Sequence, residues 1–228
     1  MNEKYNITIG VLNHNNDIFN KYIKNSLKNI KNHCEVIILK NLNPAKAYNE
    51  IIKKSKNNYI VLLHCDTEFG NSFLDSVFET IKQLPDFGVL GILGVKKVFQ
   101  LKFFFPKYVK KYIFANSHKI NEVQMLEPSC IVINKKHNLK FDDINFDEYH
   151  HIVEDYCAQV IFKKKLKLYT LLTNTFIPKD DTIAKKTLKG NYFIHYNSTF
   201  NNRGSRWGNW LKYKKKLDEK WNQKIITT

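Results

Sequence analysis

The chain of 228 residues is long enough to bury the core of one large domain or of two small ones. Its formal net charge of +16 at pH 7 keeps a nucleic-acid or anionic-membrane partner open, although A/T-rich coding would also produce such an excess of lysine and asparagine. No segment approaches the roughly 20 apolar residues of a membrane-spanning helix, and the N-terminal sequence lacks the basic start of a signal peptide, so we expect a cytoplasmic protein.

Apolar segments alternate with amphipathic segments through the first half of the chain. Strands are predicted at 7–12, 34–39, 59–63 and 87–93. Helices are predicted between them, at 19–30, 43–55 and 71–84. This order predicts an α/β fold with a mostly parallel sheet covered by helices on both faces. Ligands of such sheets bind beyond the carboxyl ends of the strands.

The second half of the chain is less regular. Segment 95–114 mixes aromatic residues with lysines and fits an amphipathic membrane-surface element, an acceptor-side loop or a partly buried excursion. Further strands are expected at 126–134 and 166–172, on either side of a helix at 149–164. Because no repeat or flexible linker is present, we expect one domain over 1–199, with halves 1–95 and 96–199, and a basic, tryptophan-rich appendage at 200–228.

Several chemistries are excluded by motifs that the sequence lacks. There is no GxxxxGK[ST] loop, and the glycine cluster of Gly88, Gly91 and Gly94 has the wrong spacing for a dinucleotide-binding loop. The cysteines are far apart and form no CxxC pair, which favours reduced cytosolic thiols at Cys34, Cys65, Cys130 and Cys157. Acids and histidines remain as the candidates for chemistry.

Two carboxylates follow the third predicted strand, in the sequence YIVLLHCDTEF (59–69). Asp66 and Glu68 can both point at one hard cation such as Mg²⁺ or Mn²⁺, and such ions often bridge to the phosphate groups of a substrate. Acids also cluster at ordinary strand-to-helix turns, so a plain surface turn is the alternative.

Glu154, Asp155 and His195 are the other candidates. A carboxylate among the apolar neighbours of a helix can serve as a general base, whereas an acid near a helix N-terminus can simply favour the helix dipole. His195 suits either a metal ligand or a hydrogen-bonded structural role. Only two of the 37 basic residues are arginines, and Arg203 and Arg206 lie together, which indicates a need for planar, multidentate donors.

Taken in order, these motifs resemble those of family 2 glycosyltransferases, the inverting enzymes of GT-A (Rossmann-like) fold that use nucleotide sugars. ITIGVLNHNN is similar to the first strand and nucleotide loop, and NPAKAYNEIIKKSKNNYIVLLHCDTEF to the helix and strand that lead to the DxD-type motif. EDYCAQVIFKKKLKLYTL resembles the Glu-Asp helix that supplies the catalytic base. HYNS followed by RGSRW is similar to the late metal-ligand histidine and the diphosphate-binding lid.

The resemblance implies a role for each candidate residue. Asp66, Glu68 and His195 would bind Mn²⁺ or Mg²⁺ against the diphosphate of a nucleotide sugar, with a UDP-sugar favoured. Glu154 or Asp155 would deprotonate the acceptor hydroxyl for a single in-line displacement with inversion. The remaining residues would bind the nucleotide and its diphosphate, namely Asn13, Asn41, Asn49, Arg203 and Arg206.

The sequence departs from the family pattern after the second strand, where Lys40 and Asn41 replace the usual acid that contacts the base. The resemblance implies a bacterial enzyme that extends a surface glycan or glycolipid, such as lipopolysaccharide or capsule, from the cytoplasmic side. The lysines and tryptophans are compatible with peripheral attachment to the inner face of an anionic membrane, and no specific nucleic acid is expected. Two alternatives remain: a non-catalytic glycosyltransferase-like partner subunit, and a basic module that binds nucleic acid or membrane.

Overall fold

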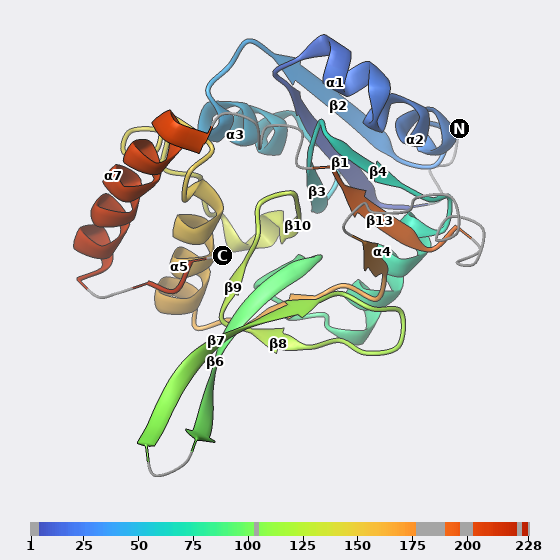
Figure 1. The fold of residues 1–228 in the computed structure, drawn as a ribbon. Helices are drawn as coiled ribbons and strands as arrows, with labels where there is room; N and C mark the ends of the chain where they lie inside the picture. Colours follow the sequence, from blue (N-terminus) through green and yellow to red (C-terminus); the bar gives the residue numbers. More distant parts are fainter. Residues whose placement is uncertain (1–4, 103–104, 177–189, 197–202, 223–224, 228) are drawn as a thin grey trace.

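A seven-stranded sheet forms the centre of the protein (Figure 1). The computed structural model describes residues 5–102, 105–176, 190–196, 203–222 and 225–227. Across the sheet the strands lie in the order β2 (Glu35–Lys40), β1 (Ile7–Asn13), β3 (Tyr59–His64), β10 (Cys130–Asn134), β5 (Val89–Gly91), β11 (Leu168–Thr170) and β8 (Glu122–Val123).

Five of these strands run in the same direction. β1 pairs in parallel with β2 and β3, and β5 pairs in parallel with β11. β10 runs antiparallel between β3 and β5, and β8 runs antiparallel beside β11. The predicted mostly parallel α/β fold is therefore confirmed, and the carboxyl ends of five strands meet at one edge.

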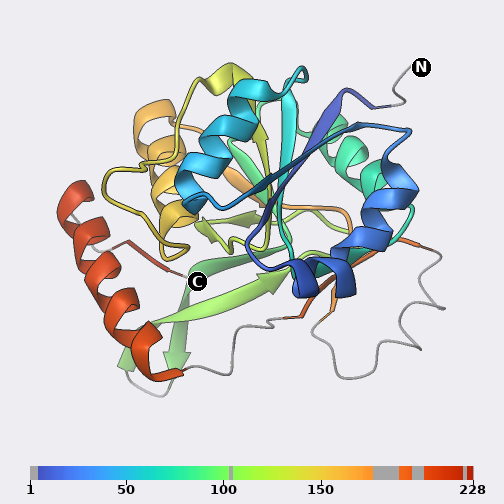
Figure 2. The same ribbon diagram turned by 90° about the horizontal axis from the view of Figure 1, so that it is seen from above.

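Helices cover both faces of the sheet, and each face has its own apolar cluster (Figure 2). One face packs against α3 (Pro44–Lys54), α5 (Ile152–Lys164) and α7 (Arg203–Trp221), and the other against α2 (Ile23–Ile30) and α4 (Phe73–Gln83). A short helix, α1 (Asn16–Lys21), follows β1. Asn43 caps α3 by accepting hydrogen bonds from the amides of Ala45 and Lys46, with Pro44 in the first turn.

Two three-stranded sheets complete the fold. One contains β12 (Asn174–Phe176), β13 (Tyr192–His195) and β4 (Thr67–Phe69), and the other contains β7 (Phe105–Phe114), β6 (Leu93–Lys102) and β9 (Met125–Leu126). A 3-10 turn, η1 (Lys135–His137), follows β10. The predicted strands at 87–93 and 126–134 are each divided between two sheets, and segment 95–114 forms a long hairpin.

The tail contributes to the main core. Helix α7 buries Tyr213 and Leu217 in the same cluster as α3 and α5, so this part of the tail packs closely on the preceding chain. The division between residues 199 and 200 remains a prediction. In the part of the chain that the structure describes, no helix has the length and apolar character needed to cross a membrane.

Candidate functional site

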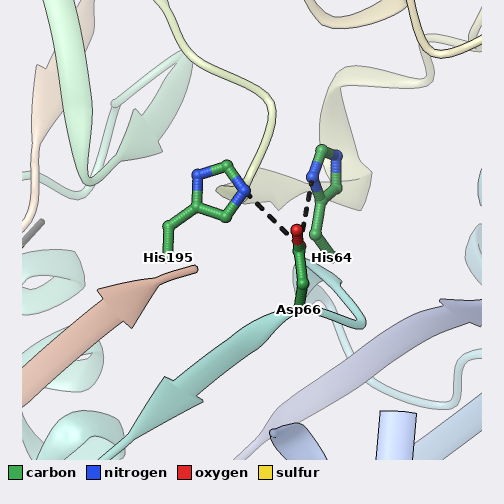
Figure 3. A group of neighbouring side chains, drawn as sticks. All are labelled: His64, Asp66 and His195. Carbon is green, nitrogen blue, oxygen red and sulfur yellow. Dashed lines mark ion pairs between the residues drawn. The ribbon is translucent and has the colours of Figure 1, made fainter. Parts of the chain in front are cut away.

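Three side chains converge beyond the carboxyl end of β3 (Figure 3). His64 ends β3, Asp66 follows on the turn into β4, and His195 ends β13. His195 Nε2 lies 3.4 Å from Asp66 Oδ1, and His64 Nδ1 lies 4.0 Å from the same oxygen. One ligand atom from each residue lies within 4.8 Å of the others, so the group can contact a single metal ion.

The pairing of β4 with β13 brings His195 to this point. His195 lies opposite Thr67 in the antiparallel ladder, and the amide of Tyr196 donates a 2.9 Å hydrogen bond to the carbonyl of Asp66. Gly70 permits this approach, because a Cβ atom there would lie 2.1 Å from the carbonyl oxygen of Gly190. The position of His195 therefore depends on a backbone contact that only glycine allows.

Burial and neighbouring charges set the protonation of the two histidines. Burial, with help from the charge of His195, lowers the pKa of His64 to about 3, so its imidazole is neutral and suited to metal ligation. Burial also opposes the charged form of His195. The hydrogen bond with Asp66 and the negative charges of Glu127 and Asp66 outweigh it and raise the pKa of His195.

Glu127 links this group to the helix that carries Glu154. It follows β9, and its Oε1 lies 3.5 Å from His195 Nδ1, while its other oxygen accepts hydrogen bonds from the amide and hydroxyl of Ser129. Burial raises the pKa of Glu127, and the charge of Glu154 adds to this rise. Glu127, Glu154, His195 and Asp66 thus form one connected set of ionisable groups.

The structure gives Glu154 and Asp155 different surroundings. Glu154 is buried, and its Oε1 lies 3.4 Å from Nδ1 of His151, a buried residue whose backbone is left-handed at φ 63° and whose ring contacts Trp210. Asp155 is also buried, but Lys220, Trp221 and Gln159 donate hydrogen bonds to its two oxygens. Asp155 therefore holds α7 against α5, while Glu154 belongs to the set of ionisable groups around His195.

The structure does not bring Glu68 into the candidate metal group of His64, Asp66 and His195. In the ladder with β13, Glu68 lies opposite Ile194, whereas His195 lies opposite Thr67, so the two side chains project from opposite faces. The carboxylate of Glu68 accepts hydrogen bonds from the hydroxyl groups of Tyr192 and Tyr196 instead. In place of Glu68, the candidate group contains His64, for which the sequence predicted only a packing role.

A depression of about 730 Å³ lies beside the carboxyl ends of β1 and β2. Asn13 lines it, and both Asn13 and the ammonium group of Lys40 donate hydrogen bonds to Asn16. The side chains of Phe19 and Ile38 form the apolar part of the wall of this depression. A depression with an apolar wall and amide groups can hold a nucleoside base, and Lys40 places a cation where the family usually has an acid.

The other predicted nucleotide-binding residues lie elsewhere. Asn41 is exposed and left-handed at φ 56°, directly after β2. Asn49 exchanges two hydrogen bonds of 2.9 Å with the backbone of Phe141, so it fixes a loop and does not face the depression. Arg203 and Arg206 lie in the first turns of α7, with side chains outside the described part of the chain.

A match to a family model shows which protein family the chain belongs to. The model described as "Glycosyl transferase family 2" matches residues 3–140, which is more than half of the sequence. The chain belongs to glycosyl transferase family 2. None of the curated proteins compared with the chain matches it.

Several solved structures are similar to part of this family 2 chain. The structure of residues 1–349 of TarS from S. aureus is 11% identical over 72% of this chain and 59% of its own length, with a TM-score of 0.48. The same TarS fragment in complex with UDP-GlcNAc is 13% identical over 72% and 57%, with a TM-score of 0.45. A197 from STIV is 14% identical over 72% and 80%, with a TM-score of 0.42. The chain spans less than two thirds of the TarS fragment, so the family assignment depends on the family model.

Proposed function

We propose that the protein is an inverting glycosyltransferase that uses a nucleoside diphosphate sugar, with a UDP-sugar favoured. The carrying observation is the convergence of His64, Asp66 and His195 at the sheet edge where ligands of such folds bind. Membership of family 2 supplies the reaction class. The acceptor is a hydroxyl of a bacterial surface glycan or glycolipid, reached from the cytoplasmic side with peripheral membrane attachment.

The donor set of the cluster fits a divalent transition metal. Two imidazoles and one carboxylate leave coordination positions open, and they are softer than the all-oxygen set that Mg²⁺ prefers, which favours Mn²⁺ over Mg²⁺. The His64 nitrogen that faces the group is Nδ1, which lies 4.0 Å from Asp66 Oδ1 and is the atom placed to contact the ion. When bound, the cation supplies positive charge opposite the diphosphate of the donor.

The residues of the chain then divide the work of the reaction. The depression beside β1 and β2 holds the nucleoside, with Asn13 and Lys40 near its polar edge. Glu154 takes the proton of the acceptor hydroxyl, whose oxygen attacks the anomeric carbon. The bond from that carbon to the diphosphate breaks with its electron pair on the diphosphate, and Arg203 or Arg206 stabilises the released charge. One displacement inverts the anomeric configuration.

A non-catalytic partner subunit is the second candidate, and Lys40 is the observation that favours it. Lys40 replaces the acid that family members usually direct at the base, and its ammonium group already donates a hydrogen bond to Asn16. A chain that binds a nucleotide without a metal and without turnover would fit this alternative.

A donor-hydrolysis assay with a panel of UDP- and GDP-sugars and Mn²⁺ tests the proposal. We expect release of the nucleoside diphosphate from at least one donor, loss of that activity in EDTA, and its loss in Asp66→Asn. A thermal-shift titration with UDP provides a second readout, since the shift should grow when Mn²⁺ is added. No turnover with any donor, together with a nucleotide shift that ignores Mn²⁺, would overturn the enzyme and favour the partner subunit.

A further inference from the structure

The β6–β7 hairpin extends away from the body of the protein (Figure 1). Its two strands pair from Leu93 and Phe114 at the base to Lys102 and Phe105 near the turn. In the described part of the chain, strand pairing with the body stops at Val95, which lies opposite Met125 of β9. The outer part is therefore a two-stranded ribbon that no other strand covers.

One face of the ribbon carries large aromatic side chains. Residues paired across antiparallel strands share a face, and every second position along a strand returns to it. This places Phe99, Tyr108, Tyr112 and Phe114 on the same face, where they are 55%, 69%, 49% and 40% exposed. The rings of Phe99 and Tyr108 touch edge to face with centroids 5.5 Å apart. Such a group of exposed rings marks a site of interaction.

Lysines are interleaved with these rings. Lys97 lies directly opposite Lys110 on the aromatic face, and Lys96 lies opposite Lys111 at the next position on the other face. Like charges directly opposite one another destabilise a strand pair. Among the described residues, none of the four lysines forms an ion pair with a carboxylate, so no negative charge offsets the repulsion. Lys110 instead lies over the ring of Tyr112, 5.0 Å from its centroid. An anionic partner would relieve the repulsion.

We propose that this face, made of residues 97, 99, 108, 110, 112 and 114, docks onto an anionic lipid membrane. Lysine ammonium groups near a membrane are attracted by anionic headgroups, and Phe and Tyr rings prefer the interfacial layer between headgroups and acyl chains. Single-stranded nucleic acid needs open ring faces on which bases can stack. Phe99 and Tyr108 instead pack edge to face against each other, and this compact pair of rings favours a lipid partner over a nucleic acid. This inference does not depend on catalytic activity.

Flotation of the full chain with vesicles tests the proposal. Vesicles of phosphatidylcholine alone are compared with vesicles that also contain phosphatidylglycerol, at low and high salt. Each lysine at an anionic surface strengthens binding about fivefold, so Lys97→Gln with Lys110→Gln should weaken partition to the anionic vesicles about 25-fold. Phe99→Ser with Tyr108→Ser should weaken it at both salt concentrations, since its contribution is not electrostatic.

A matched pair of lysine substitutions on another element distinguishes an effect of the hairpin from an effect of net charge. Lys24→Gln with Lys28→Gln removes the same charge from exposed positions on α2 and should leave partition within about twofold of wild type, by the screening of distant charges. Thermal unfolding checks that every variant is folded. Equal losses from both lysine pairs, or partition that is the same for neutral and anionic vesicles, would overturn the proposal. Tight binding of single-stranded DNA by the same face without vesicle binding would replace it with a nucleic-acid site.

Discussion

Replacing Asp155 with asparagine keeps the shape of the side chain but removes the charge that holds helix α7. Asp155 accepts hydrogen bonds of 2.9 Å from Lys220, 2.9 Å from Trp221 and 3.0 Å from Gln159. An asparagine offers one acceptor oxygen, and its amide group would face donors. Breaking a buried ion pair costs about 3 to 5 kcal/mol. Lys220 keeps a second ion-pair partner, Asp142, at 2.7 Å. We therefore expect the free energy of unfolding to fall by an amount at the low end of this range, about 3 kcal/mol.

That loss is measurable as a fall in melting temperature. For a chain of this length each kcal/mol shifts the Tm by about 2 to 4 °C, so Asp155→Asn should melt about 6 to 12 °C below wild type. Circular dichroism at 222 nm, roughly the helix minimum used to follow unfolding, gives the Tm. Donor hydrolysis is measured well below the Tm of both proteins, where Asp155→Asn should retain most of the wild-type turnover.

The adjacent variant Glu154→Gln is the matched control, since it makes the same chemical change at another buried acid of α5. If Glu154 is the general base, its kcat falls about 10²- to 10⁴-fold. Its Tm should stay close to the wild-type value, because the weaker contact with His151 is offset by removal of a negative charge near Glu127. The reasoning is refuted if Asp155→Asn melts like wild type without turnover while Glu154→Gln remains active; that result would make Asp155 the base.

Three further predictions concern positioning, acid stability and thiol reactivity. Gly70→Ala should weaken Mn²⁺ binding, measured by calorimetry, because its Cβ would push β13 and His195 away; unchanged affinity would show that the backbone contact is not needed. Burial acts to raise the pKa of Asp142, but hydrogen bonds led by that from Lys220 lower it to about 2, below its usual 3.8. The stability that this group contributes is present above pH 3.8 and is lost as the pH falls towards 2, so urea midpoints of Asp142→Asn should depend less on pH in this window; parallel curves would contradict this. Burial raises the pKa of Cys65 to about 11. At pH 8, which is roughly half a unit below the pKa of a free thiol, iodoacetamide should therefore modify Cys65 only when the protein unfolds. Rapid labelling of the folded protein would disprove this.

The central sheet was predictable because its strands are buried on both faces. Continuous apolar strands such as β1 and β3 and capped helices such as α3 carry their pattern in the local sequence. In the outer part of the β6–β7 ribbon, no residue whose side chain the structure describes is buried, so no period of two distinguishes it from a loop. Helix α7 had a readable signal that was missed, since Tyr213, Leu217 and Trp221 recur every four residues along one side.

The site was only partly predictable for a different reason. Asp66 and His195 stand in motifs, but Glu127 enters the site because a turn between β9 and β10 places it beside His195, which no local pattern records. Glu68 was assigned to the metal from its spacing to Asp66 alone. The pairing of β4 with β13 decides which face each side chain occupies, and that pairing joins distant segments.

The dependence of the site on β13 has a consequence for biosynthesis. Glu68 and Tyr196, which meet across the β4–β13 ladder, are separated by 128 residues. At usual elongation speeds a ribosome needs roughly 6 to 26 s to add such a length. During that interval the first strands and helices can collapse while the edge that carries Asp66 still lacks His195. A nascent chain halted before β13 would therefore contain all seven strands of the central sheet but an incomplete candidate metal group.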